Sequence, residues 1–79
     1  MNKDDRQFLE RVGFRIRERR LAAGLTQAGL ADRCGLHRTF IGSVERGERN
    51  VALLSLRKIA ASLRVSAADL LADAKPVVE

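Results

Sequence analysis

The sequence is poor in several residue types on which other protein classes depend. It has one cysteine, so no disulfide can form within the chain, and it has neither tryptophan nor tyrosine. Its one proline, Pro76, blocks helix continuation, so we expect a loose tail over about residues 74–79. It contains no long apolar run and no charged-then-apolar leader, which argues against membrane insertion and secretion. These absences favour a protein of the reducing cytoplasm.

Catalytic and metal-binding patterns are also missing. The only histidine, His37, has no evident nucleophile beside it, and no phosphate-binding glycine loop occurs. Cys34 and His37 are three positions apart, but no further residues supply a third and fourth ligand at zinc-like spacing. The acidic residues are better explained as caps, ion pairs or exposed charges: Glu45, Glu48, Asp69 and Asp73. We therefore predict no enzyme activity, no metal and no cofactor.

The residues that are present indicate one small all-α domain spanning 1–79. The chain is 46% hydrophobic, no strand pattern competes with the helical ones, and the core must be mainly Leu, Ile, Val and Ala. A domain of 79 residues buries only a little over ~60% of its unfolded surface, so a partner subunit would help its stability.

Positive charge predominates, with 15 basic residues against 10 acidic and a net charge of +5. All but three of the basic residues are arginine, whose planar fork suits phosphates and guanine edges. A genome rich in G and C also encodes much arginine, and net charge alone does not distinguish DNA from RNA or a membrane surface.

Two short helical patterns lie next to each other at about residues 26–46. Thr26 is a suitable N-cap for the first, whose apolar residues recur up to Gly35. The second begins at about His37 or Arg38 and runs to Arg46, where Gly47 stops it. One side of this second helix is apolar, and the residues predicted on its outward side are small, polar or cationic: Arg38, Thr39, Gly42, Ser43 and Arg46. A helix with such a narrow polar face fits the major groove of DNA.

The segment LTQAGLADRCGLHRTFIGSVERGERN resembles the helix-turn-helix of Xre-type, phage-repressor-like DNA-binding proteins. Its second part is similar to the controller proteins of restriction-modification systems. The resemblance covers roughly Val12 to Leu71 and implies a compact five-helix, lambda-repressor-like domain. It also implies that Arg20, which falls on the buried stripe of the first helix, pairs with Glu45; the alternative is that Arg20 reaches out to solvent.

The other three helices follow from apolar periodicity and caps. We expect the first to begin at Asp4 or Asp5, after a frayed Met1 to Lys3, and to end at Gly24. The fourth should bury one stripe, made of Leu53, Leu56, Ile59, Ala60 and Leu63. Ser66 should cap the fifth, with Asp69 at the capping-box position but shorter than the usual glutamate. Gly29, in the middle of the second helix, has no predicted function.

The predicted DNA contacts fall into two sets. Base edges should be read by Arg38, Thr39 and Ser43, which project from the first two turns of the recognition helix. Arg38 could instead hold only a phosphate, and His37 could instead cap its helix. The predicted phosphate contacts are Gln27, His37, the backbone of Phe40, Arg46 and Arg49.

Apolar residues that fit no buried stripe predict a symmetric dimer, with an interface at Leu54, Ala67 and Leu71. Phe14 and Val77 are also left over, and scattered exposed apolar residues are common in monomers as well. The leading functional prediction is a homodimeric, sequence-specific transcriptional regulator on a palindromic operator, with the control of a restriction-modification operon as its suggested role. RNA polymerase is a further candidate partner. The alternative is an antitoxin that masks a toxin and regulates its own operon.

Overall fold

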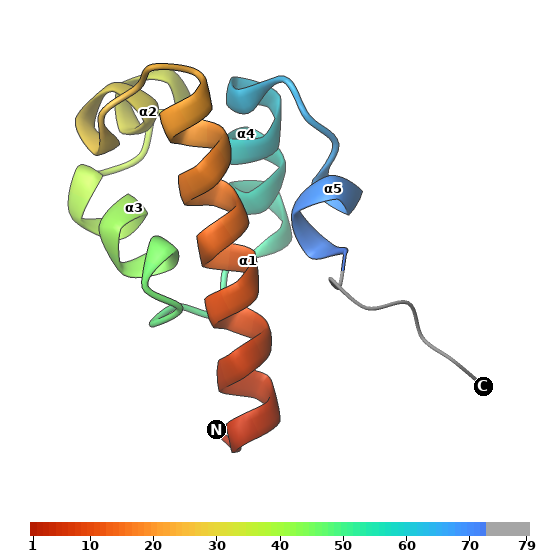
Figure 1. Cartoon of the computed structure of the whole chain (residues 1–79). Coiled ribbons are helices and arrows are strands. Elements are labelled where there is room, and N and C mark those ends of the chain that lie inside the picture. Colours follow the sequence, from red (N-terminus) through yellow and green to blue (C-terminus); the bar gives the residue numbers. More distant parts are fainter. Residues whose placement is uncertain (73–79) are drawn as a thin grey trace.

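The described residues form five helices. Figure 1 shows how they are arranged. The structure is a computed structural model that describes residues 1–72. The helices are α1 (Lys3–Ala22), α2 (Gln27–Cys34), α3 (Arg38–Glu45), α4 (Leu53–Leu63) and α5 (Ala67–Leu71). Within the described residues there is no strand and no helix long and apolar enough to cross a membrane. The predicted all-α, five-helix architecture is confirmed. The predicted tail over about residues 74–79 lies outside the described part of the chain.

Each helix contributes one large side chain to the centre of the core. The fully buried residues of this kind are Ile16, Leu30, Ile41, Ile59 and Leu70, in the order α1 to α5. Smaller side chains fill the spaces between them, among them Ala31 and Ala60, each 2% exposed. The four helices α2 to α5 have only 5 to 11 residues and are marginal on their own in water, so burial of these stripes supplies most of their stability.

The long helix α1 packs against α3, α4 and α5, and it comes closest to the end of α3. Where it passes α3, Gly13 faces the backbone carbonyls of Val44 and Glu45, and a Cβ atom at Gly13 would overlap both oxygens. One turn earlier, Glu10 lies against Gly47, where a Cβ would come within 2.6 to 2.8 Å of Glu10 atoms. The two glycines therefore allow α1 to approach the end of α3 at backbone distance.

Several boundary predictions need correction. The helix α1 begins at Lys3, because Asn2 caps it by accepting a hydrogen bond from the Asp5 N–H at 2.8 Å. Leu53 is 80% exposed, so the buried stripe of α4 starts only at Leu56. Both halves of the capping box exist at α5: Ser66 Oγ accepts from the Asp69 N–H at 3.0 Å, and Asp69 Oδ2 accepts from the Ser66 N–H at 3.1 Å. The shorter aspartate is long enough.

Candidate nucleic-acid interface

The turn between α2 and α3 fixes the angle at which α3 is presented. Thr26 caps α2 by accepting from the Gly29 N–H at 2.9 Å, as expected. Gly35 ends α2 with φ at +68°, a conformation that favours glycine, and the Leu36 N–H then donates to the Ala31 carbonyl at 3.0 Å. His37 occupies the N-cap position of α3, but its side chain makes no capping hydrogen bond. The imidazole of His37 is exposed and stays available for another contact.

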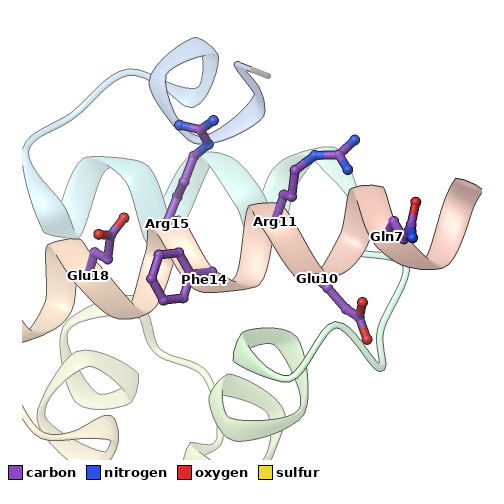
Figure 2. A pocket seen from close by; sticks show the side chains of 6 residues that line it. All are labelled: Gln7, Glu10, Arg11, Phe14, Arg15 and Glu18. Carbon is purple, nitrogen blue, oxygen red and sulfur yellow. The ribbon is translucent and has the colours of Figure 1, made fainter. Parts of the chain in front are cut away.

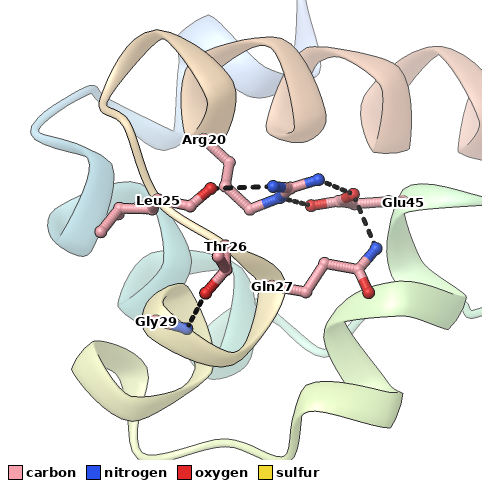
Figure 3. A network of polar contacts seen from close by, with 6 residues as sticks. All are labelled: Arg20, Leu25, Thr26, Gln27, Gly29 and Glu45. Carbon is pink, nitrogen blue, oxygen red and sulfur yellow. Dashed lines mark hydrogen bonds and ion pairs between the residues drawn. The ribbon is translucent and has the colours of Figure 1, made fainter.

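A buried ion pair joins α1 to the end of α3 (Figure 3). Arg20 Nε donates to Glu45 Oε2 at 2.6 Å and Arg20 Nη2 donates to Glu45 Oε1 at 3.0 Å, so the guanidinium binds the carboxylate with two parallel bonds. Arg20 Nη1 also donates to the Leu25 carbonyl at 2.8 Å, just ahead of α2. The hydrogen bonds to Glu45 raise the pKa of Arg20 above its ordinary value. This is the pair that the family resemblance implied.

Gln27 extends the network to α2. Its Nε2 donates to Glu45 Oε1 at 3.1 Å, so one carboxylate oxygen accepts from side chains of two helices (Figure 3). The sequence predicted that the Gln27 amide is free for a phosphate, and the structure shows that one of its hydrogens is already used. Within residues 1–72, no buried side-chain nitrogen or oxygen lacks a hydrogen-bond partner. The carboxylate of Glu45 thereby links α1, α2 and α3.

An open groove lies between the start of α2 and the exposed face of α3. Its lining includes the exposed Arg38 and Thr39 together with Gln27, Gly42 and Arg46. Space above Gly42 is occupied by side chains: a Cβ there would stand 3.2 Å from Arg46 Nη1 and 3.3 Å from Gln27 Oε1. Gly42 was predicted on the outward side of α3, but it is buried and makes room for these two side chains.

Ser43 does not lie on the outward face, contrary to prediction. It is 8% exposed, its hydroxyl donates to the Phe40 carbonyl at 2.8 Å, and its Oγ accepts from Arg49 Nε at 3.3 Å. Ser43 was misplaced because we assigned polar residues of α3 to the solvent side, and the side that faces solvent is narrower than the set of polar residues. The guanidinium of Arg49 also lies 5.7 Å from the centre of the Phe40 ring, within cation–π range.

Arg46 is held by an acidic neighbour. Its Nε and Nη2 donate to the two carboxylate oxygens of Glu48, both at 3.1 Å, and both side chains are more than half exposed. The hydrogen bonds from Arg46, with a smaller contribution from the charge of Arg49, keep the pKa of Glu48 below its ordinary value. The same hydrogen bonds, which Arg46 donates to Glu48, raise the pKa of Arg46 above its ordinary value.

Other surfaces lie away from this groove. Figure 2 shows the outer face of α1, where the exposed Phe14 is flanked by charged side chains that point to either side. At the predicted dimer interface, Leu54 is 65% exposed and Leu71 38% exposed, whereas Ala67 is half-buried against the core. The neighbouring Leu53 is an exposed apolar residue that the sequence reading had placed inside. Cys34 is buried, with its Sγ 3.4 Å from Ser62 Oγ.

Comparison with known proteins agrees with this geometry. A family model described as helix-turn-helix matches residues 16–70. Control protein C.BamHI of Bacillus amyloliquefaciens is 45% identical over 60 residues, which are 75% of this chain and 74% of that protein. Control protein C.SmaI of Serratia marcescens is 50% identical over 56 residues, or 71% of this chain and 67% of that protein.

Solved structures include a similar fold. The crystal structure of the restriction-modification controller protein C.AhdI from Aeromonas hydrophila aligns with a TM-score of 0.76 and 42% sequence identity. The alignment covers 81% of this chain and 96% of that one, so nearly the whole of that controller protein has a counterpart here.

Proposed function

The chain belongs to the Xre-type helix-turn-helix family, and from that premise we propose that it is a sequence-specific transcriptional regulator that controls a restriction-modification operon. Relatives named as restriction-modification control proteins align over most of the chain, which supports this role. In the proposal it acts in the cytoplasm as a homodimer on a palindromic operator.

The observation that carries the proposal is the placement of Arg38 and Thr39. Both are exposed at the start of α3, and the helix beneath them is fixed by the Arg20–Glu45 pair. A guanidinium at this place can donate to O6 and N7 of one guanine, a pattern that no other base presents in the major groove. Thr39 offers a methyl group for thymine and a hydroxyl for a base edge. We leave Ser43 out of the base-reading set because its hydroxyl is bonded within the protein.

Phosphate contacts would fix the register of α3 in the groove. The candidates remain Arg46, Arg49, His37, the Phe40 backbone N–H and the second Nε2 hydrogen of Gln27. They lie at the two ends of α3 and at the start of α2, where a helix seated in the major groove meets the two DNA backbones. Such contacts make affinity fall with salt, with a log–log slope of about −0.9 for each neutralised phosphate.

The test begins with selection of genome fragments by the purified protein, followed by footprinting. We expect a protected site with two-fold symmetry and half-sites about one helical turn, ~34–36 Å, apart. Arg38→Ala should then lower affinity for the selected site by about 1 to 3 kcal/mol and relax the preference at one position in each half-site. Arg57→Ala, an exposed arginine of α4, is the matched control.

Two results would contradict the assignment. If Arg38→Ala weakens binding to the selected site and to random DNA by the same factor, Arg38 holds a phosphate and base reading falls to Thr39. If no fragment is enriched at all, the proposed function fails. We also propose that the protein contacts RNA polymerase if it activates transcription. To detect this, the selected fragment would be transcribed by purified polymerase with and without the protein.

A further inference from the structure

The carboxylate of Glu48 binds Arg46, one of the arginines proposed above to contact the DNA backbone. Arg46 is the C-cap of α3, and its Nη1 reaches back to within 3.2 Å of the Cβ position at Gly42, so its guanidinium lines the groove. Two of its nitrogens nevertheless bind the carboxylate of Glu48, each at 3.1 Å. This two-bond arrangement is the one that arginine also uses with phosphate.

The chain conformation around Gly47 brings the two side chains together. Gly47 has φ at +76° and turns the chain after α3, so that residues 46 and 48 lie on the same side of the turn. The turn itself is fixed by the contact of Gly47 with Glu10 and by the Glu48 N–H, which donates to the Ser43 carbonyl at 2.9 Å. The Arg46–Glu48 pair is therefore a feature of a rigid turn, and only its side chains are free to move.

We propose that Glu48 is an internal competitor for the DNA phosphate at Arg46, and so sets how strongly this protein holds DNA of any sequence. In the free protein the Glu48 carboxylate accepts from Nε and Nη2 of Arg46. On DNA a phosphate accepts from the same two nitrogens, and the Glu48 side chain moves into solvent. The inference rests on the proposed DNA-binding function and adds a residue that opposes binding.

Two properties of the pair favour this role over a purely structural one. Both side chains are more than half exposed, and exposed ion pairs add little to folding stability. An exposed carboxylate can also leave its partner without any repacking. Arg49 differs, because its Nε is bonded to Ser43 Oγ and its guanidinium lies over the Phe40 ring. The structure thus shows one arginine held by a carboxylate that can leave and one held by groups of the helix itself.

The experiment compares Glu48→Gln with the unchanged protein on a short random-sequence duplex, over a series of salt concentrations. No operator is needed, because the contact is with the backbone. We expect Glu48→Gln to bind about two- to fivefold more tightly for each bound subunit, the range that corresponds to release of one exposed ion pair. The log–log salt slope should also become steeper, because no freed carboxylate then takes up a cation.

A double-mutant cycle separates this mechanism from a general effect of charge. In an Arg46→Ala background, Glu48→Gln should gain much less, because only the weaker charge interaction of Glu48 with Arg49 is then relieved. Glu18→Gln, which removes one exposed negative charge from the outer face of α1, should change affinity little in either background. Circular dichroism checks that each variant keeps its helices.

The outcomes are distinct. An equal gain with and without Arg46 would overturn the inference in favour of long-range charge, and a loss of affinity in Glu48→Gln would show that Glu48 itself assists binding. In both cases the unchanged protein still binds DNA, so the proposed function stands. Failure of the unchanged protein to bind any DNA with a salt-dependent affinity would instead remove the proposed function.

Discussion

At the scale of single residues, Glu45 connects the three helices α1, α2 and α3. Its carboxylate accepts from Arg20 of α1 and from Gln27 of α2, while its own backbone ends α3. Charges this well buried are stable only when they are paired, because the cost of removing them from water is large. We therefore expect the network to matter more for the position of α3 than for stability, since apolar residues of similar size could fill the same space.

A mutation cycle on the ion pair tests this view. Glu45→Leu leaves the guanidinium of Arg20 buried without its partner, so we expect the free energy of unfolding to fall by about 3 to 5 kcal/mol. The double change Arg20→Met with Glu45→Leu should recover much of that loss, while DNA affinity should not recover, because α3 is no longer held. Urea unfolding measures the first effect and a DNA titration the second. Additive losses below about 1 kcal/mol would indicate that the pair is effectively exposed.

Helical periodicity predicts which side of a helix a residue lies on, but it does not predict which partner its side chain contacts. Helical spacing placed Arg20 on the buried stripe and Arg38 and Thr39 outside, and all three lie there. Ser43 was misplaced because it is polar and near the face boundary, and its burial depends on a hydrogen bond to its own helix. The bonds of Gln27 and Arg46 to acidic partners were missed because they depend on side-chain directions that spacing does not determine.

At the scale of the elements, glycines decide how closely α1 and α3 approach. A glycine in the middle of a helix costs about 0.5 to 1 kcal/mol relative to alanine, so Gly13 is unfavourable for α1 considered alone. The crossing with α3 explains it, because only a hydrogen fits between the two backbones there. The sequence offered one usable signal, a glycine directly beside the buried stripe residues Val12 and Ile16, but the backbone facing it became known only from the fold.

Gly13 and Gly29 form a matched pair for testing this point. Gly13→Ala should destabilise the protein by about 1 to 3 kcal/mol or more, because the Cβ meets backbone that cannot move aside. Gly29→Ala should change the free energy of unfolding by less than about 1 kcal/mol, since its Cβ meets only the Thr26 and Leu25 side chains and gains helix propensity. Thermal or urea unfolding of both variants gives the comparison. Equal effects would show that the crossing has room for a methyl group.

The capping box of α5 makes a prediction about pH. The Ser66 backbone N–H, then its hydroxyl, hold the pKa of Asp69 below its ordinary value. Because the folded-state pKa is the lower one, the stabilisation is complete above the unfolded value of about 3.9 and is lost as the pH falls through the folded-state value. Asp69→Asn should therefore lower the melting temperature at pH 7 and have a smaller effect in acid. A difference that is constant with pH would assign the effect to shape alone.

At the scale of the whole molecule, the exposed surface has two regions of different chemical character. The α2–α3 groove is lined by exposed arginines. The surface of α4 and α5 instead has three exposed leucines: Leu53, Leu54 and Leu71. A single recognition helix reads only a few base pairs, and two copies related by a two-fold axis multiply its discrimination. We expect such an axis to pass beside the exposed leucines of α4 and α5, because they lie outside the α2–α3 groove.

Replacement of these leucines tests the dimer. Leu54→Glu combined with Leu71→Glu should yield a monomer that keeps its helices, because both side chains are substantially exposed and neither belongs to the buried core. Leu21→Glu is the matched control, since Leu21 is 55% exposed at the C-terminal end of α1. Sedimentation equilibrium at roughly tens of micromolar, far above the concentrations at which specific binders act, reports the state of association.

The double variant should lose most of its affinity for a palindromic site while its binding to random DNA changes far less, because two linked half-sites contribute only when both can be occupied at once. An unchanged protein that sediments as a monomer would remove the dimer, and the expected symmetric footprint would then have to come from two subunits that meet only on DNA.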